Sequence, residues 1–183
     1  MKVVQPIRDL DLIKEIAQFL KEKNERDYVL FAIGIYTGLR IADMLKLKVA
    51  DVKDKTHIEI HEGKTKKLKR IKLSPDLNRI LKGYIAGKED KEYLFKSRQG
   101  NGGPISRERA YAILKEAANE FRLKNIGCHS MRKTFGYFMY ESTGHDVALL
   151  QELFNHSSPE ITLRYIGINQ DSHDKAIDTL KFL

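Results

Sequence analysis

Four short segments of the chain carry side chains that could act on an anion such as a phosphate. They read Thr37-Gly38-Leu39-Arg40, Gly63-Lys64, His129-Ser130-Met131-Arg132, and His156 followed nine positions later by Tyr165. An arginine guanidinium is always charged and can bind two phosphate oxygens at once. Two arginines could therefore neutralise a phosphate, which otherwise repels an approaching nucleophile, and stabilise the transition state of its reaction.

The tyrosine in the last segment could be that nucleophile. Its hydroxyl reacts poorly until a base or a nearby positive charge favours the ionised form, and either His129 or His156 could serve. Lys64, on a flexible turn, is suited to donate a proton to the leaving oxygen. Arg40 opens a helix, where the backbone N–H groups and the helix dipole also favour an anion.

Each of these residues also has an ordinary structural interpretation. Arg40 could form a salt bridge with Asp43 one turn further on. Lys64 lies in a run of basic residues, which is typical of a solvated hairpin face. The two histidines could simply pair or cap locally, and Tyr165 could be an aromatic residue at the rim of the core. The order of the four segments and the elements around them decide between the interpretations.

The apolar pattern predicts mainly helices. Asp9 or Asp11 can cap a first helix, whose apolar residues follow the i, i+3, i+4 spacing: Leu12, Ile13, Ile16, Phe19 and Leu20. Residues 28–36 are apolar on all sides, which predicts a buried central helix that ends at Gly38, and a short helix begins around Arg40. Further helices are predicted over residues 106–122, 129–142, 145–154, 158–166 and 172–181.

The segment after the short helix changes to an alternating pattern. Ile58 and Ile60 lie on one side, a turn follows at Gly63, and residues 71–73 return, which predicts a β-hairpin. Ser74 and Pro75 then start another helix, and residues 93–95 could add a third short strand. The predicted fold class is mainly α with a small antiparallel β-sheet, an α+β protein.

In this order and context, the four segments resemble the catalytic domain of the tyrosine recombinases, the phage integrase family. The resemblance runs from about residue 7 to residue 166 and implies the DNA breaking-rejoining fold. It assigns six catalytic residues: Arg40, Lys64, His129, Arg132, His156 and the nucleophile Tyr165. Three supporting positions depart from the family pattern: Asp43 stands for glutamate, Met131 for leucine, and Asn155 for glycine.

The resemblance implies a site-specific DNA recombinase or integrase that cleaves and rejoins strands through a 3′-phosphotyrosine. The covalent link conserves the energy of the broken phosphodiester, so neither ATP nor another cofactor is expected. No metal is expected either, since His57 and His61 share a face of a predicted strand but lie too far apart to bind one ion. The alternatives are a catalytically silent DNA-binding regulator on the same fold and a relaxing enzyme like the type IB topoisomerases.

The composition suits a polyanionic partner, here double-stranded DNA. The 33 Lys and Arg outnumber the 25 Asp and Glu, which gives a net charge of +8 and a pI near 9.4. Candidates for DNA contacts are Lys66 and Lys67 on the hairpin and Arg107 and Arg109 on the following helix. Lys66 is also the alternative to Lys64 in the catalytic role.

The length of 183 residues fits one domain, so residues 1–183 are expected to be a single catalytic domain without the N-terminal core-binding domain that family members usually carry. By the resemblance, the protein acts as a homotetramer on DNA and could be a monomer without it. The tail, about residues 167–183, could pass to a neighbouring protomer or fold back on its own core. The lone Cys128 excludes an internal disulfide. The longest apolar run is too short to span a bilayer, and a cytoplasmic protein is expected.

Overall fold

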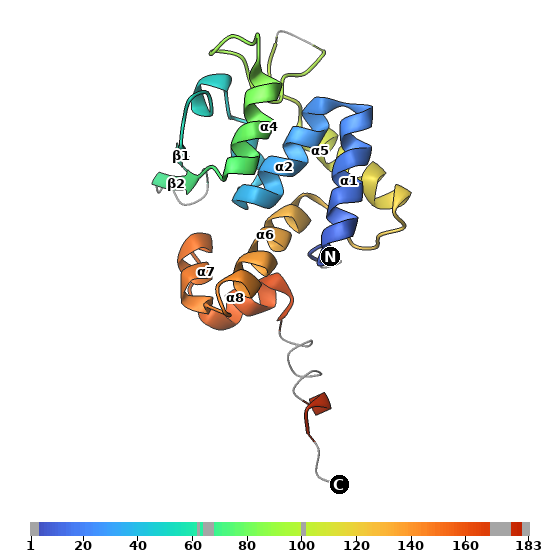
Figure 1. The fold of residues 1–183 in the computed structure, drawn as a ribbon, viewed down its shortest axis with the longest axis vertical. Coiled ribbons are helices and arrows are strands. Elements are labelled where there is room, and N and C mark those ends of the chain that lie inside the picture. The colour runs from blue at the N-terminus through green and yellow to red at the C-terminus, as the bar shows by residue number, and fades with distance from the viewer. Residues whose placement is uncertain (1–3, 62, 64–67, 100–101, 169–176, 181–183) are drawn as a thin grey trace.

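The computed structural model describes residues 4–61, 63, 68–99, 102–168 and 177–180 (Figure 1). Its elements confirm the predicted fold class. They are α1 (Leu10–Lys23), α2 (Glu25–Thr37), α3 (Ile41–Met44), η1 (Val49–Asp51), β1 (His57–His61), β2 (Leu68–Lys72), α4 (Pro75–Ile85), α5 (Arg107–Glu120), α6 (Cys128–Ser142), α7 (Val147–Phe154) and α8 (Pro159–Ile166). Among the described residues, no helix is both long enough and apolar enough to cross a membrane.

Side-chain caps fix where several helices begin. Asp9, not Asp11, caps α1, because its carboxylate accepts hydrogen bonds from the backbone N–H groups of residues 11 and 12. Ser74, Ser106 and Ser158 cap α4, α5 and α8 in the same way, each through the N–H three residues on. These local signals explain why the predicted starts of these four helices agree with the structure to within one or two residues.

Helix α2 is the centre of the main hydrophobic core. Val29, Leu30 and Ile33 on it are fully buried. At Gly34 the helix comes so close to α6 that an added Cβ would lie 2.4 Å from the sulfur of Met131. The methionine that replaces the family's leucine is therefore packed between the two helices, where its flexible thioether fits the gap.

The hairpin has the predicted antiparallel pairing. Ile58 of β1 lies opposite Ile71 of β2, and both side chains are buried. The predicted third strand at residues 93–95 is wrong. In the described chain Tyr93 forms only an isolated bridge with Lys48, because the Leu94 N–H bonds to Leu47 while the Phe95 carbonyl accepts from Ile105. Since successive residues bond to two different segments, no continuous ladder forms.

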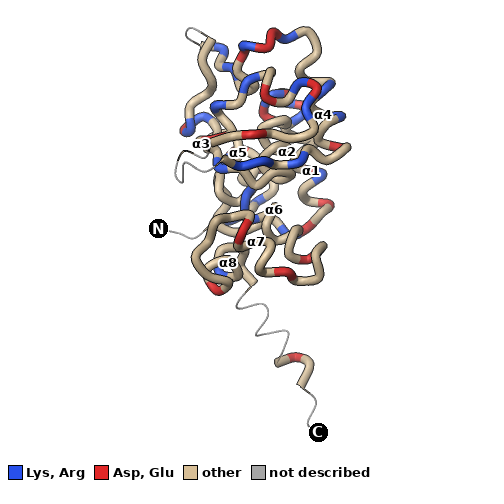
Figure 2. The backbone as a smooth tube through the Cα atoms, turned by 90° about the vertical axis from the view of Figure 1, so that its left-hand side faces the viewer, with Lys and Arg blue, Asp and Glu red and all other residues tan. Residues whose placement is uncertain are grey.

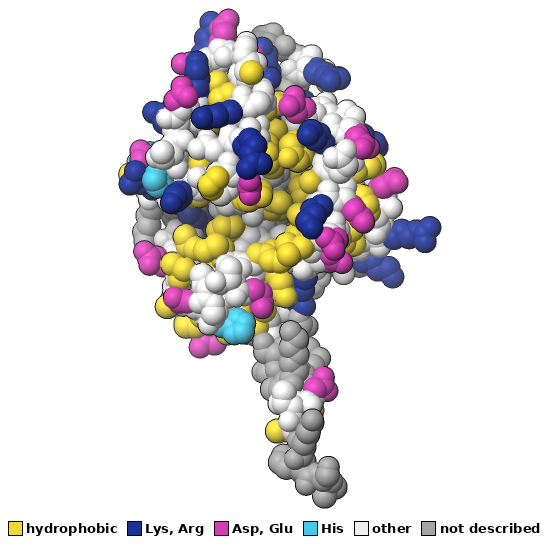
Figure 3. All heavy atoms as spheres, in the orientation of Figure 1, with side chains coloured by type: hydrophobic (Ala, Val, Ile, Leu, Met, Phe, Trp, Pro, Cys, Tyr) yellow, Lys and Arg dark blue, Asp and Glu magenta, His cyan; other side chains and the backbone are white. Residues whose placement is uncertain are grey.

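A second, smaller core holds helices α7 and α8 against the C-terminal half of α6. Leu150, Phe154, Ile166 and Ile168 form it, and Tyr165 packs against its edge. Helix α6 runs from the main core into this one, so it joins the two groups of helices (Figure 1). Apolar side chains reach the surface along the join between the groups (Figure 3).

The predicted last helix, residues 172–181, falls largely outside the described residues. Of that segment only residues 177–180 are described, and Ile177 and Leu180 on it are 64% and 57% exposed. Exchange of the tail between protomers stays a prediction.

Candidate active site

Arg132 is the most firmly held of the expected catalytic residues. It lies on the second turn of α6 and is only 3% exposed. Its guanidinium donates to the carbonyl of Gly38, at the end of α2, and to that of Phe154, at the end of α7, over 3.5 Å. The guanidinium carbon also lies 4.4 Å from the centre of the Phe154 ring. Arg132 therefore connects the end of α2 with the end of α7, where the two hydrophobic cores meet.

The end of α2 places Arg40 beside Arg132. Gly38 adopts a left-handed conformation with φ 60°, which ends the helix and turns the chain. Two residues later, Arg40 directly precedes the short helix α3; it is half-buried, and its Nη1 atom is shielded from solvent. The Gly38 carbonyl, which accepts the hydrogen bond from Arg132, thus belongs to the same turn as Arg40.

Tyr165 and His156 are in contact. Their ring centres are 5.1 Å apart in an edge-to-face arrangement, and the Phe154 ring lies 5.4 Å from that of Tyr165. Asn155, directly before His156, has a left-handed φ of 53° and ends α7. This is a conformation that glycine adopts freely and asparagine tolerates, which explains how asparagine can replace the family's glycine here.

The hydrogen bonds of His156 indicate its tautomer. Its Nδ1 atom lies 3.1 Å from the hydroxyl oxygen of Thr162, which is fully buried, and that hydroxyl donates to the carbonyl of Ser158. A hydroxyl has one proton, so the Thr162 oxygen accepts from Nδ1–H. In neutral His156 the Nε2 atom is therefore the proton acceptor.

The charges around the site act on three titratable groups. Burial raises the pKa of Tyr165, while the charge of Arg132, a hydrogen bond from it and the charge of Arg40 oppose this. Burial and both arginines lower the pKa of His156, with a further contribution from Lys69. The pKa of His129 is also lowered, by partial burial of its ring and by Arg132, Lys133 and Arg40. Both histidines are therefore favoured in the neutral form, which can accept a proton.

The hairpin is fastened to the site at two places. The backbone N–H of Gly63 donates to the carboxylate of Asp43 over 3.1 Å, and Asp43 is only 3% exposed. Lys69 of β2 donates to the carbonyl of Leu153 at the end of α7. Asp43, which replaces the family's glutamate, therefore holds the turn directly before Lys64. Lys64 itself, and the expected DNA contacts Lys66 and Lys67, lie outside the described residues.

The other two expected DNA contacts lie on the first turn of α5. Arg107 and Arg109 are exposed, but a nitrogen of Arg109 also lies 3.8 Å from a carboxylate oxygen of the buried Asp27. Arg26 pairs with the same carboxylate at 2.8 Å. Arg109 thus has a structural role as well, and contact of either residue with DNA stays a prediction.

The N-terminal segment is bound to the end of the helix that carries Tyr165. Arg8 donates to the carbonyl of Gly167 over 2.8 Å, and its guanidinium lies 5.3 Å from the ring centre of Tyr137. One residue earlier, the N–H of Ile7 donates to the hydroxyl of Thr134 over 2.8 Å. The segment therefore connects α6 with the end of α8, and nothing in the sequence pattern pointed to this.

Sequence reasoning also missed Lys133. It follows Arg132 on α6, is 5% exposed, and places its ammonium 5.2 Å from the ring centre of Tyr165. The sequence marks it only as one of many lysines, and the signal that distinguishes it is its burial.

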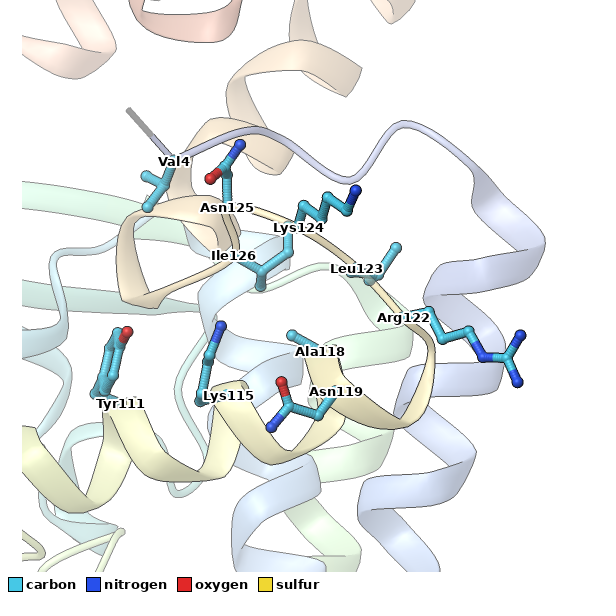
Figure 4. Close-up of a pocket in the computed structure, with 10 residues that line it drawn as sticks. All are labelled: Val4, Tyr111, Lys115, Ala118, Asn119, Arg122, Leu123, Lys124, Asn125 and Ile126. Atoms are coloured by element: carbon cyan, nitrogen blue, oxygen red, sulfur yellow. The ribbon is translucent and has the colours of Figure 1, made fainter. Parts of the chain in front are cut away.

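A cavity of about 780 Å³ lies elsewhere, between the C-terminal half of α5 and the loop before α6 (Figure 4). Tyr111 and Lys115 rise into it from α5, toward Ile126. None of the expected catalytic residues that the structure describes lines this cavity. Among the residues that the structure describes, no group of three or more His, Cys, Asp or Glu side chains is placed to hold a metal ion.

The comparison with protein families agrees with this arrangement, since the model of the phage integrase family matches residues 9–172. The chain belongs to the phage integrase family. Within the family, it is 49% identical to the probable integrase/recombinase YoeC of Bacillus subtilis (strain 168), over 94% of both chains. It is 27% identical to the tyrosine recombinase XerA of Pyrococcus furiosus, over 93% of this chain and 60% of that one. The chain thus spans nearly all of one family member and little more than half of the other.

Solved structures of the family have the same fold. A crystal structure of XerA recombinase matches 99% of this chain and 68% of its own, with a TM-score of 0.75 at 19% identity. A post-cleavage complex of the XerH site-specific recombinase with a palindromic difH substrate matches 97% of this chain and 54% of its own, with a TM-score of 0.74 at 22% identity. At these identities the likeness concerns the integrase-family fold alone.

Proposed function

We propose that this protein is a site-specific DNA recombinase that cleaves and rejoins DNA strands through a 3′-phosphotyrosine at Tyr165. The observation that supports this most is the contact of Tyr165 with His156 beside the charges of Arg132 and Arg40. A tyrosine that must attack a phosphate needs a proton acceptor and positive charge at the same place. Family membership adds independent support.

The two arginines bind the scissile phosphate. Arg132 is fixed by the carbonyls of Gly38 and Phe154, so its charge is in position before the substrate arrives. Preorganised charge of this kind stabilises the pentacoordinate transition state without rearrangement of the site. Arg40 adds a second charge from the adjoining turn.

The proton of the Tyr165 hydroxyl passes to Nε2 of neutral His156 as the oxygen attacks phosphorus. The contact between the two rings favours His156 over His129 in this role. The Tyr165 oxygen–phosphorus bond forms, the bond from phosphorus to the 5′-oxygen breaks, and Lys64 donates a proton to that oxygen. Attack by a 5′-hydroxyl on the phosphotyrosine reverses these steps and reseals a strand, so the scheme needs neither a metal nor ATP.

Double-stranded DNA is the proposed partner. The net charge of +8 favours a polyanion, and basic residues follow one another along β2, beside the site (Figure 2). Recombination joins two duplexes, so we propose a homotetramer on DNA in which the tail of residues 167–183 contacts a neighbouring protomer. The proposed location is the cytoplasm, where the substrate DNA is accessible.

A covalent trapping assay tests the proposal. The protein is incubated with nicked suicide duplexes made from its own flanking genomic DNA, and denaturing gels are searched for a DNA-linked band. The band is expected with the wild type and with the control Tyr111→Phe, an exposed tyrosine on α5, and is expected to vanish with Tyr165→Phe.

Two other results would refute it. Tight DNA binding without any covalent band would support a silent regulator on the same fold. Relaxation of supercoiled plasmids that lack a cognate sequence would support an enzyme like the type IB topoisomerases.

A further inference from the structure

Lys133 is a buried cation in contact with the proposed nucleophile. Its side chain is 5% exposed, and its ammonium nitrogen lies 5.2 Å from the ring centre of Tyr165. In the described part of the chain, this nitrogen makes no hydrogen bond and no ion pair. Burial lowers the pKa of Lys133, because the charged ammonium loses part of its hydration.

A lysine in such a place is unfavourable for folding alone. Burying most of a lysine side chain without an acidic partner for its ammonium group destabilises the folded state, and an apolar side chain of the same length would avoid this. Here the charge of Lys133 lies against the ring of Tyr165. The position therefore indicates that the charge acts on that ring.

We propose that Lys133 is a positioning residue that holds the Tyr165 ring and favours its ionised form; this rests on the proposed role of Tyr165 as nucleophile. A cation over an aromatic ring is attracted by the electrons of the ring. When the hydroxyl loses its proton, negative charge spreads into the ring and the attraction increases. Lys133 thus stabilises the phenolate more than the phenol, which is the difference that a reaction needs.

The ring of Tyr165 is contacted from three parts of the fold. Lys133 comes from α6, Phe154 from the end of α7, and His156 from the segment between α7 and α8. The charges of Arg132 on α6 and Arg40 at the start of α3 act on the ionisation of Tyr165, and Lys133 on α6 and His156 contact its ring. Among these, only Lys133 contacts the face of the ring as a cation.

The test compares Lys133→Met with Lys133→Arg. Methionine keeps the length of the side chain and removes the charge, and arginine keeps the charge. Lys82→Met, on the exposed side of α4, is the matched control. Thermal unfolding and DNA affinity are measured for each variant, and covalent adduct formation is followed at saturating suicide substrate across a range of pH.

Removing the charge makes Tyr165 harder to ionise, so the pH–rate profile of Lys133→Met is expected to move to higher pH by about one unit, which is about a tenfold slower reaction at pH 7. Lys133→Arg and Lys82→Met are expected to keep the wild-type profile. A wild-type profile in Lys133→Met would overturn the proposal. So would an equal loss of rate at every pH in both Lys133 variants, because that result indicates a structural role.

A second measurement needs no DNA. Protein labelled with ¹³C at tyrosine Cζ is titrated by NMR, and the Tyr165 signal is assigned by its absence in Tyr165→Phe. The ionisation of Tyr165 is expected to move to higher pH in Lys133→Met, and an unchanged titration would overturn the inference. If the titration moves but the wild type forms no covalent adduct, the proposed function has failed and the Lys133 contact stands.

Discussion

Replacing Gly136 by alanine is expected to destabilise the protein and to slow the reaction of Tyr165. Gly136 lies on α6 where the helix faces α7 and α8. A Cβ atom there would lie 2.6 Å from Cγ2 of Ile166 and 2.7 Å from two ring atoms of Phe154. These distances are shorter than van der Waals contact, so α6 and α8 would have to move apart.

The expected magnitude combines two opposing effects. Overpacking of a core costs about 1–3 kcal/mol. Alanine gains up to about 1 kcal/mol over glycine inside a helix. After a gain of about 1 kcal/mol is subtracted, the net loss in the free energy of unfolding is up to about 2 kcal/mol, measured by urea denaturation at neutral pH. Since Ile166 adjoins Tyr165 and Phe154 packs on its ring, the covalent adduct should also form more slowly, because a shift of about 1 Å in a reacting group can lower a rate about a hundredfold.

Gly83→Ala is the matched control. Gly83 lies inside α4 and an added Cβ would meet nothing within 4 Å, so the same substitution should stabilise the protein by about 0.5–1 kcal/mol. It should leave the rate of adduct formation unchanged. A Gly136→Ala protein as stable and as fast as the wild type would refute the close packing of α6 against α7 and α8.

Three further predictions concern the site. Thr162→Val removes the hydroxyl that orients His156, so adduct formation should slow by about tenfold to a hundredfold at unchanged DNA affinity in a binding titration, and an unchanged rate would exclude this role. Arg132→Lys keeps a charge but loses the forked donors, so the rate should fall by about a hundredfold or more in the same assay; a smaller loss would mean that charge alone suffices. Because the pKa values of His129 and His156 are lowered in the folded state, protonation favours the unfolded chain. The stability that the neutral rings contribute is complete above pH about 6.5 and is lost as the pH falls through the lower folded values. Urea unfolding at pH 7.5 and 5.0 should show a smaller acid loss in His156→Gln than in the wild type, and an equal loss would contradict the pKa shift.

The features that the sequence predicted correctly are local ones. Serine caps at positions 74, 106 and 158 set the starts of helices, because a cap needs only the next three residues. The alternation that pairs Ile58 with Ile71 likewise depends on neighbouring residues in one hairpin. The segment at residues 93–95 looked like a strand for the same local reasons, but its hydrogen bonds go to two distant segments, which a local pattern cannot show.

The same distinction applies to the site. Motifs identified Arg40, Arg132, His156 and Tyr165, and the fold brings these residues together. Motifs did not identify Lys133 or Thr162, since a lysine and a threonine on a helix look ordinary until the fold buries them. Their proposed roles depend on tertiary packing alone.

The contact of Arg8 with Gly167 joins residues that are 159 positions apart in the chain. The carbonyl that Arg8 binds lies two residues after Tyr165, at the end of α8. A movement of residues 4–8 would thus reach the helix that carries Tyr165 through this hydrogen bond. The start of the described chain is therefore attached to the end of α8, so a partner that bound residues 4–6 would act on the position of Tyr165.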